Sequence, residues 1–272
     1  MPFARIGDLE FCYERAGAGP PLIYISGTNG DLRVRPNILD GPLPAHFDVI
    51  AYDQRNLGRS SKPDAACTMA DYADDAAAMI AFAGWDRANV IGVSFGGMVA
   101  QELAIRHPGR VRRLVLACSS PGGAGGASFP IHTLAGLAPE ERARRQITIM
   151  DRRRDAAWMA AHPEECAALV AAFADPFAGE TGRAAGETGR AAGARRQLEA
   201  RAGHDTWDRL DRIACPTLIA GGRYDDQAPP DRQEAMAGRI RGATLRLFEG
   251  GHRFLQDDPA ALPAVIAFLE EE

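Results

Sequence analysis

The chain has 272 residues, of which 46% are hydrophobic and 25% are charged, and these proportions exclude disordered and fibrous proteins. The formal net charge is −5, which does not favour a nucleic-acid partner. The sequence shows no secretory signal and no apolar run of the ~18 residues that a membrane span needs. Its five cysteines are dispersed without a CxxC pair, which favours a reducing, cytoplasmic location over a disulfide framework or a zinc site.

The first part of the chain alternates short apolar runs with helical patterns. Strands are predicted over residues 3–6, 9–15, 21–26, 47–53, 89–93 and 113–118, and helices over residues 69–83 and 95–107. The alternation resumes late, where residues 217–220 and 244–248 predict strands and residues 230–239 and 259–270 predict helices. Buried strands that alternate with helices are typical of a mostly parallel sheet covered on both faces, so the predicted fold class is α/β.

The stretch between these two parts has a different composition. Residues 120–212 lack convincing strands and are rich in Ala, Arg and Glu, which favour helices. We therefore predict a core formed by residues 1–119 and 213–272, and a helical cap formed by residues 120–212. The cap contains the heptapeptide GETGRAA twice in tandem, over residues 179–192. The repeat lacks the apolar a and d positions of a coiled coil, which favours a duplicated exposed segment.

A sharp turn between a predicted strand and a predicted helix carries the clearest chemical signal. Residues 92–96 read Gly-Val-Ser-Phe-Gly, a GxSxG motif. The two glycines allow a tight turn that presents the Ser94 hydroxyl above the sheet edge, at the positive end of the following helix. This context predicts that Ser94 is a nucleophile rather than only a residue that satisfies the helix N-terminus.

A serine hydroxyl needs a base to take its proton, and the base needs an acid to orient it. His252 follows two glycines in the loop after the last predicted strand, at the carboxyl edge where Ser94 is expected. The other five histidines are interpreted as surface or capping residues, and no two histidines have metal-ligand spacing. Asp225 and Asp226 follow another predicted strand and reach the same edge, so the residues alone leave the choice of acid open.

The oxyanion that forms during acyl transfer needs N–H donors. One predicted donor is the backbone N–H of Phe95, directly after the nucleophile. The second is expected from residues 26–30, the loop after an early strand, where Gly27 permits the turn. The backbone N–H of Thr28 is our first choice there and that of Asn29 our second.

On these motifs the sequence resembles the α/β-hydrolase fold superfamily over essentially its whole length, within the branch of esterases, lactonases and serine-haloperoxidase-like enzymes. The matching segments are GVSFGG at 92–97, DQRNLGRS at 53–60, GRYDDQAP at 222–229 and GGHRF at 250–254. The resemblance implies an eight-stranded sheet, a helical cap after the sixth strand, and hydrolysis without a cofactor or a metal.

The resemblance also implies roles for single residues. The family spacing Gly-x-x-Asp-x-x-x-Pro places the acid at Asp225, which completes a triad of Ser94, Asp225 and His252. The loop at residues 53–60 is implied to be structural rather than catalytic. Asn56 stands at the first glycine of the family pattern D-x-R-G-x-G-x-S, so we expect left-handed backbone there, which Asn tolerates well.

The predicted function is that of a serine hydrolase of the EC 3.1.1 type, which cleaves a carboxylic ester or lactone through an acyl-enzyme on Ser94. A serine nucleophile disfavours the dehalogenase and epoxide-hydrolase branches of the fold. Two alternatives stay open: a hydrolase of carbon–carbon bonds in diketone-type substrates, and a small-molecule receptor without turnover. The expected partner is a small-molecule ester or lactone, and the expected state is a monomer or a small homo-oligomer.

Large side chains of the predicted cap are candidates for lining a substrate pocket, although burial in the core of the cap is the more ordinary role for any one of them. These are the aromatic and thioether residues Phe129, Trp158, Met159, Phe173, Phe177 and Trp207. The sequence does not distinguish which of them face the pocket.

Overall fold

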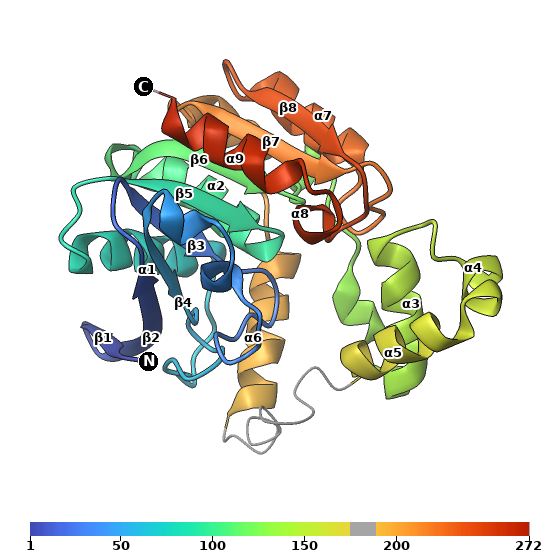
Figure 1. The fold of residues 1–272 in the computed structure, drawn as a ribbon. Helices are drawn as coiled ribbons and strands as arrows, with labels where there is room; N and C mark the ends of the chain where they lie inside the picture. The colour runs from blue at the N-terminus through green and yellow to red at the C-terminus, as the bar shows by residue number, and fades with distance from the viewer. Residues whose placement is uncertain (175–188, 272) are drawn as a thin grey trace.

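A single eight-stranded sheet forms the centre of the computed structural model, which describes residues 1–174 and 189–271 (Figure 1). The strands are β1 (Phe3–Ile6), β2 (Leu9–Ala16), β3 (Pro21–Ile25), β4 (Asp48–Tyr52), β5 (Ala88–Val93), β6 (Val111–Ala117), β7 (Thr217–Gly222) and β8 (Thr244–Phe248). They lie in the order β1-β2-β4-β3-β5-β6-β7-β8. The pairs β1–β2 and β2–β4 are antiparallel and all other neighbours are parallel, so the predicted α/β class and mostly parallel eight-stranded sheet are confirmed.

The central strands are mostly apolar and largely buried because helices cover both of their faces. All six residues of β7 are buried, and so are five of the six residues of β5. On one face, α1 (Met69–Phe82), α2 (Phe95–Arg106) and α7 (Pro230–Arg239) pack over a core that includes Met79 and Met236. On the other face, α9 (Ala261–Glu270) packs over a second core with Val265 and Leu269 (Figure 1).

The helix boundaries follow local signals where such signals exist. Thr68 begins α1 with a capping box, in which Thr68 and Asp71 bond to each other's backbone N–H. At the C-terminal end the prediction is less accurate, because α9 begins at Ala261 rather than at residue 259. The short helix α8 (Phe254–Asp257) was not predicted, since four residues are too few for a periodic pattern.

Four α-helices lie between β6 and β7 within the described residues. They are α3 (Pro139–Met150), α4 (Ala156–Ala161), α5 (Pro163–Ala174) and α6 (Arg190–Ala202). α3, α4 and α5 lie together to one side of the sheet (Figure 1), and α3 and α5 share a small apolar core with Ile147 and Val170. The GETGRAA repeat lies outside the described residues except for its last four positions, where α6 begins.

The last of these helices, α6, is attached to the loops that follow β3 and β4. Oε1 of Gln197 accepts a hydrogen bond of 2.9 Å from the backbone N–H of Asn29. Nearer the start of the helix, Arg190 lies 3.2 Å from the carboxylate of Asp31. A side chain in place of Gly193 would overlap the carbonyl oxygen of Asn56, so the helix backbone approaches this loop closely. α6 therefore lies against the loops at the carboxyl ends of β3 and β4.

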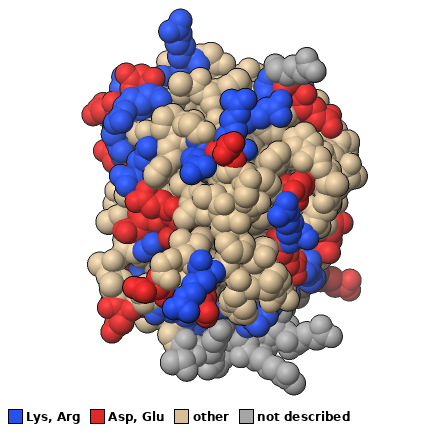
Figure 2. Space-filling model, turned by 90° about the vertical axis from the view of Figure 1, so that its left-hand side faces the viewer, with Lys and Arg blue, Asp and Glu red and all other residues tan. Residues whose placement is uncertain are grey.

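The surface mixes charges of both signs. Figure 2 shows Lys and Arg interspersed with Asp and Glu over one face of the molecule. A nucleic-acid partner would require basic side chains concentrated along a stripe, and this face does not present one among the described residues. Within residues 1–174 and 189–271, no helix combines the length and the apolar composition needed to cross a membrane.

Candidate active site

The turn between β5 and α2 holds Ser94 in a strained backbone conformation. Its φ and ψ are 56° and −114°, outside the regions that residues with a side chain ordinarily occupy. A Cβ on Gly92 would overlap the carbonyl oxygen of Gly96, and a Cβ on Gly96 would overlap that of Ile25. The glycines at these two positions are therefore required for the tight turn, and Ser94 stands directly before the first residue of α2.

His252 and Asp225 lie beside Ser94 at the carboxyl edge of the sheet. Nε2 of His252 is 2.9 Å from Oγ of Ser94, and Nδ1 of His252 is 2.8 Å from Oδ2 of Asp225. The Asp225 side chain is fully buried and its other oxygen, Oδ1, accepts the backbone N–H groups of Gln227 and Ala228 at 2.8 and 2.9 Å. Since these two donors fix the carboxylate, Oδ2 faces the imidazole.

The two neighbouring aspartates have different surroundings. Asp226 forms an ion pair of 3.1 Å with Arg152, in which both side chains are about half exposed. Its backbone N–H bonds to the carbonyl oxygen of Ile149. The arrangement places Asp225, and not Asp226, within hydrogen-bond distance of the imidazole.

The carboxylate beside His252 changes the basicity of the ring. Burial disfavours the charged imidazolium and lowers the pKa of His252, but the charge and hydrogen bond of Asp225, together with a smaller contribution from Cys118, outweigh this effect. The pKa of His252 therefore lies well above the ordinary value of 6.5. With the Nδ1 proton directed to Asp225, the neutral ring presents the lone pair of Nε2 to Ser94.

The loop after β3 approaches the same point. Gly30 N–H closes a turn onto the carbonyl oxygen of Gly27, and Nε2 of Gln54 donates to the carbonyl oxygen of Ser26 at 2.8 Å. The N–H of Asn29 is engaged with Gln197, so it is not free to bind an oxyanion. Within the described residues, the backbone N–H groups of Thr28 and Phe95 have no acceptor, as an oxyanion site requires.

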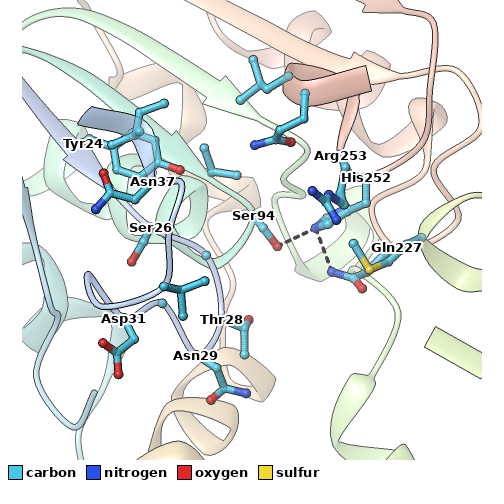
Figure 3. Close-up of a pocket in the computed structure, with 18 of the residues that line it drawn as sticks. Tyr24, Ser26, Thr28, Asn29, Asp31, Asn37, Ser94, Gln227, His252 and Arg253 are labelled. Carbon is cyan, nitrogen blue, oxygen red and sulfur yellow. Dashed lines mark hydrogen bonds between the residues drawn. The ribbon is translucent and has the colours of Figure 1, made fainter. Parts of the chain in front are cut away.

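These groups open onto a cavity of about 1120 Å³. Ser94, His252 and the loop after β3 form one end of it (Figure 3). The segment between β6 and β7 contributes a largely apolar wall with a few polar groups, formed by Ile131, Leu134, Ala135, Arg142, Gln146, Met150, Phe173 and Leu198. The volume is sufficient for a ligand of ordinary small-molecule size.

The structure narrows the set of large side chains that could contact a ligand. Of the candidates whose positions are described, Phe173 lines the cavity. Trp158 instead stacks on His162 with ring centroids 4.8 Å apart, and Trp207 packs against the core beneath α2 and α7. Phe177 lies outside the described residues. The more ordinary role, burial in packing contacts, therefore applies to both tryptophans, and neither lines the cavity.

Two residues beside the imidazole were not predicted from the sequence. Nε2 of Gln227 lies 2.8 Å from Nε2 of His252 (Figure 3). Cys118, directly after β6, is buried, and a ligand-type atom of each of Cys118, Asp225 and His252 lies within 4.8 Å of the others. Among the described residues, these three come nearest to the arrangement of a metal-ligand set. Asp225 and His252, however, are already hydrogen-bonded to each other. Cys118 could have been considered from its position at a carboxyl strand end, whereas the direction of the Gln227 side chain has no sequence signal.

Asn56, in the loop after β4, has a φ of 71°, which is the left-handed backbone expected at this position. Its neighbour Asp53 accepts the backbone N–H groups of Leu32 and Arg59 at 2.8 and 2.9 Å. Burial raises the pKa of Asp53 to about 6, although these two bonds favour its charged form. Asp53 thus binds the backbone of its own loop and of the loop after β3.

Comparisons with known proteins agree with this fold. A family model described as alpha/beta hydrolase fold matches residues 20–260. RutD of Azorhizobium caulinodans, provisionally named a carbamate hydrolase, is 30% identical over 261 residues, which cover 93% of this chain and 92% of that protein. The poly(3-hydroxyalkanoate) depolymerase of Ectopseudomonas oleovorans is 28% identical over 261 residues, covering 93% of this chain and 85% of that one.

A comparison with a solved structure supports the same fold. The enol-lactonase from Burkholderia xenovorans LB400 superposes with a TM-score of 0.78 over 99% of this chain and 100% of that chain. Its sequence identity is 22%, so this likeness concerns the fold alone. The family match over most of the sequence and the topology of the sheet lead to one conclusion: the chain belongs to the α/β hydrolase fold family.

Proposed function

We propose that the protein is a serine hydrolase that cleaves a carboxylic ester or lactone through an acyl-enzyme on Ser94. The observation that carries this proposal is the continuous chain of hydrogen bonds from Ser94 through His252 to the buried Asp225. A serine, a neutral imidazole and a fixed carboxylate in this order are the groups that make a hydroxyl nucleophilic. The name of the depolymerase, which concerns a polyester, supports the same bond type.

In the first half of the proposed reaction, Nε2 of His252 takes the proton of Ser94 while Oγ attacks the carbonyl carbon. The backbone N–H groups of Phe95 and Thr28 bind the resulting oxyanion; each such donor contributes ~3–4 kcal/mol to transition-state stabilisation. Asp225 stabilises the imidazolium. The imidazolium then protonates the leaving oxygen, the carbon–oxygen bond breaks, and the acyl group stays on Ser94. With a lactone, the released hydroxyl remains part of the same acyl group.

In the second half, water replaces the leaving group. His252 takes a proton from the water, the hydroxide attacks the acyl carbon, and the carboxylic acid leaves as Ser94 regains its proton. Besides substrate and water, these reaction steps use only side chains and backbone groups of the chain. The proposal therefore includes no cofactor or metal. We further propose that residues 120–212 act as a cap that shapes the cavity, and that the protein works in the cytoplasm as a monomer or a small homo-oligomer.

A substrate panel tests the reaction type. Purified protein is offered matched p-nitrophenyl esters, simple lactones, a p-nitrophenyl carbamate and a vinylogous diketone, and kcat/KM is measured for each. The proposal predicts turnover of an ester or a lactone at a kcat/KM at least ten times that for the carbamate and the diketone. A higher kcat/KM for the carbamate or the diketone would transfer the assignment to that bond type. Absence of turnover on every member would instead favour a receptor.

The reaction is expected to depend on pH through His252. Only the neutral imidazole accepts the Ser94 proton, so kcat/KM rises with pH as His252 loses its charge. Because Asp225 raises the pKa of His252, the midpoint of this rise is expected above pH 6.5. A pH profile of kcat/KM on an activated ester measures it. A profile that is already level below pH 6 would contradict the assignment of His252 as the base.

Phe173 is expected to influence the choice of acyl group. It lines the cavity, so Phe173→Ala enlarges the space for an acyl chain and changes the ratio of kcat/KM between long and short chains by about tenfold or more, as pocket contacts of this size do. Trp158→Ala is the matched control, because Trp158 packs away from the cavity. The control is expected to lower Tm and to leave the ratio within twofold. Equal changes in the ratio for both variants would contradict the placement of Phe173.

A further inference from the structure

Gln227 is a polar residue that lies next to the proposed triad and takes no part in the proposed reaction steps. It is 5% exposed and lines the cavity beside His252. Its backbone is held on both sides, because its N–H bonds to Asp225 and its carbonyl oxygen accepts the N–H of Phe129 at 2.8 Å. The side chain therefore starts from a fixed point, and its amide reaches Nε2 of the imidazole (Figure 3).

The proton on the other ring nitrogen determines the direction of this contact. Nδ1 of His252 faces the carboxylate of Asp225 at 2.8 Å, so Nδ1 carries the proton. In the neutral ring Nε2 is then an acceptor. The N–H of Gln227 at 2.8 Å and the hydroxyl of Ser94 at 2.9 Å both donate to this one lone pair. The opposite amide orientation would turn Oε1, an acceptor, towards a lone pair.

We propose that Gln227 is a second hydrogen-bond donor to Nε2 of His252 and that it favours the neutral, proton-accepting form of the imidazole in the free enzyme. An N–H that points at Nε2 donates to its lone pair and so stabilises the neutral ring. It destabilises the imidazolium, because the protonated Nε2–H and the amide N–H would then repel each other. Gln227 thus counteracts Asp225, which favours the charged ring. The inference rests on the proposed function, because that function assigns His252 as the base. The contact between Gln227 and His252 is observed independently of that assignment.

The other groups around the imidazole are accounted for. Asp225 and Cys118 face the ring from the loops that follow β7 and β6, and the ring itself is largely buried. From α3, the carbonyl oxygen of Met150 accepts the His252 backbone N–H, and Asp151 beside it is paired with Arg153. Arg253 follows in the chain and Tyr24 lines the same cavity. Gln227 is uncharged, so its removal changes hydrogen bonding to Nε2 without removing a formal charge.

The first test replaces the amide by a side chain of similar length that cannot donate. In Gln227→Met, the midpoint of the kcat/KM rise is expected to move up by ~0.5–1 pH unit, the shift equivalent to one ordinary hydrogen bond. Activity on the high-pH plateau is expected to be within threefold of wild type, because Ser94 keeps its acceptor. Gln227→Glu is expected to move the midpoint up by more than one unit, since a carboxylate accepts from the imidazolium and stabilises it.

The controls separate this role from a structural one. Gln146→Met changes another amide that lines the cavity and has no contact with His252 among the described residues, and it is expected to leave the midpoint unchanged. Tm is measured for every variant. The protonation of His252 is followed directly by NMR titration of its ring Cε1–H, which needs no substrate, so a failure of the proposed hydrolysis would not hide the effect.

The outcomes divide clearly. An upward shift of the NMR midpoint in Gln227→Met, absent in Gln146→Met, supports the proposal whether or not an ester is turned over. An unchanged midpoint in Gln227→Met overturns it and leaves Gln227 a packing residue. A downward shift also overturns it, because the amide oxygen rather than the nitrogen would then face the ring.

Discussion

Ser94→Ala is expected to lower kcat on an activated ester by about 10³–10⁶-fold, because alanine lacks the oxygen that forms the acyl-enzyme. Folding is expected to be retained, since the strained turn depends on the glycines at 92 and 96 and alanine adopts the same backbone at no greater cost than serine. Steady-state kinetics and thermal unfolding of the two proteins measure both quantities. Activity within tenfold of wild type would remove Ser94 from the mechanism.

A matched serine and a covalent probe sharpen this experiment. Ser61→Ala removes a hydroxyl that accepts a hydrogen bond from the Glu10 backbone at 2.8 Å, away from the cavity, and is expected to change kcat less than twofold on the scale of ordinary surface variants. A serine-directed phosphonate is expected to label Ser94 alone, as read by mass spectrometry of peptides. Labelling of another serine would show that a different hydroxyl is the reactive one.

Asp225→Asn is expected to lower kcat by about 10⁴-fold, which is the loss when the base is held in the wrong tautomer. The amide of asparagine can donate to Nδ1 of His252, so the ring proton moves to Nε2 and the lone pair facing Ser94 is lost. The substitution is nearly isosteric and keeps an oxygen that can accept the N–H groups of Gln227 and Ala228. Far-ultraviolet circular dichroism and Tm are therefore expected to change little.

Asp226→Asn is the matched control at the adjacent position. It removes the exposed ion pair with Arg152, which contributes ~0–1 kcal/mol to stability. Its kcat is expected to fall less than tenfold, because Asp226 does not contact His252. A larger loss in Asp226→Asn than in Asp225→Asn would reverse the assignment of the acid, and mild losses in both would place the acid elsewhere in the chain.

Features written in short stretches of sequence could be predicted. The turn at Ser94 combines a strand pattern, two glycines and a helix pattern within a few residues, so its geometry follows from local sterics. His252 and Asp225 could be placed near it because parallel strands end at a common edge of the sheet. The left-handed backbone at Asn56 likewise follows from the conformational tolerance of Asn.

Features that depend on packing between distant segments could not be predicted. Nothing in the composition of α6 indicates that Gln197 binds the loop after β3, because that contact joins residues 168 positions apart. The same reason explains why Trp158 and Trp207 were not separated from Phe173. Gln227 lies inside a segment used for the family resemblance, but the direction of its side chain depends on how the turn after β7 faces His252.

The chain separation within the triad has a consequence for refolding. Ser94 and His252 are 158 positions apart, whereas α1 and α2 form through local contacts. Helices of this kind form within about a microsecond, while pairing of distant strands has to overcome the entropy of closing a long loop. The active centre is complete only after β7 and β8 have joined β5 and β6 in the sheet. Recovered activity after dilution from denaturant should therefore follow the slowest phase of refolding and lag behind the return of helical circular dichroism.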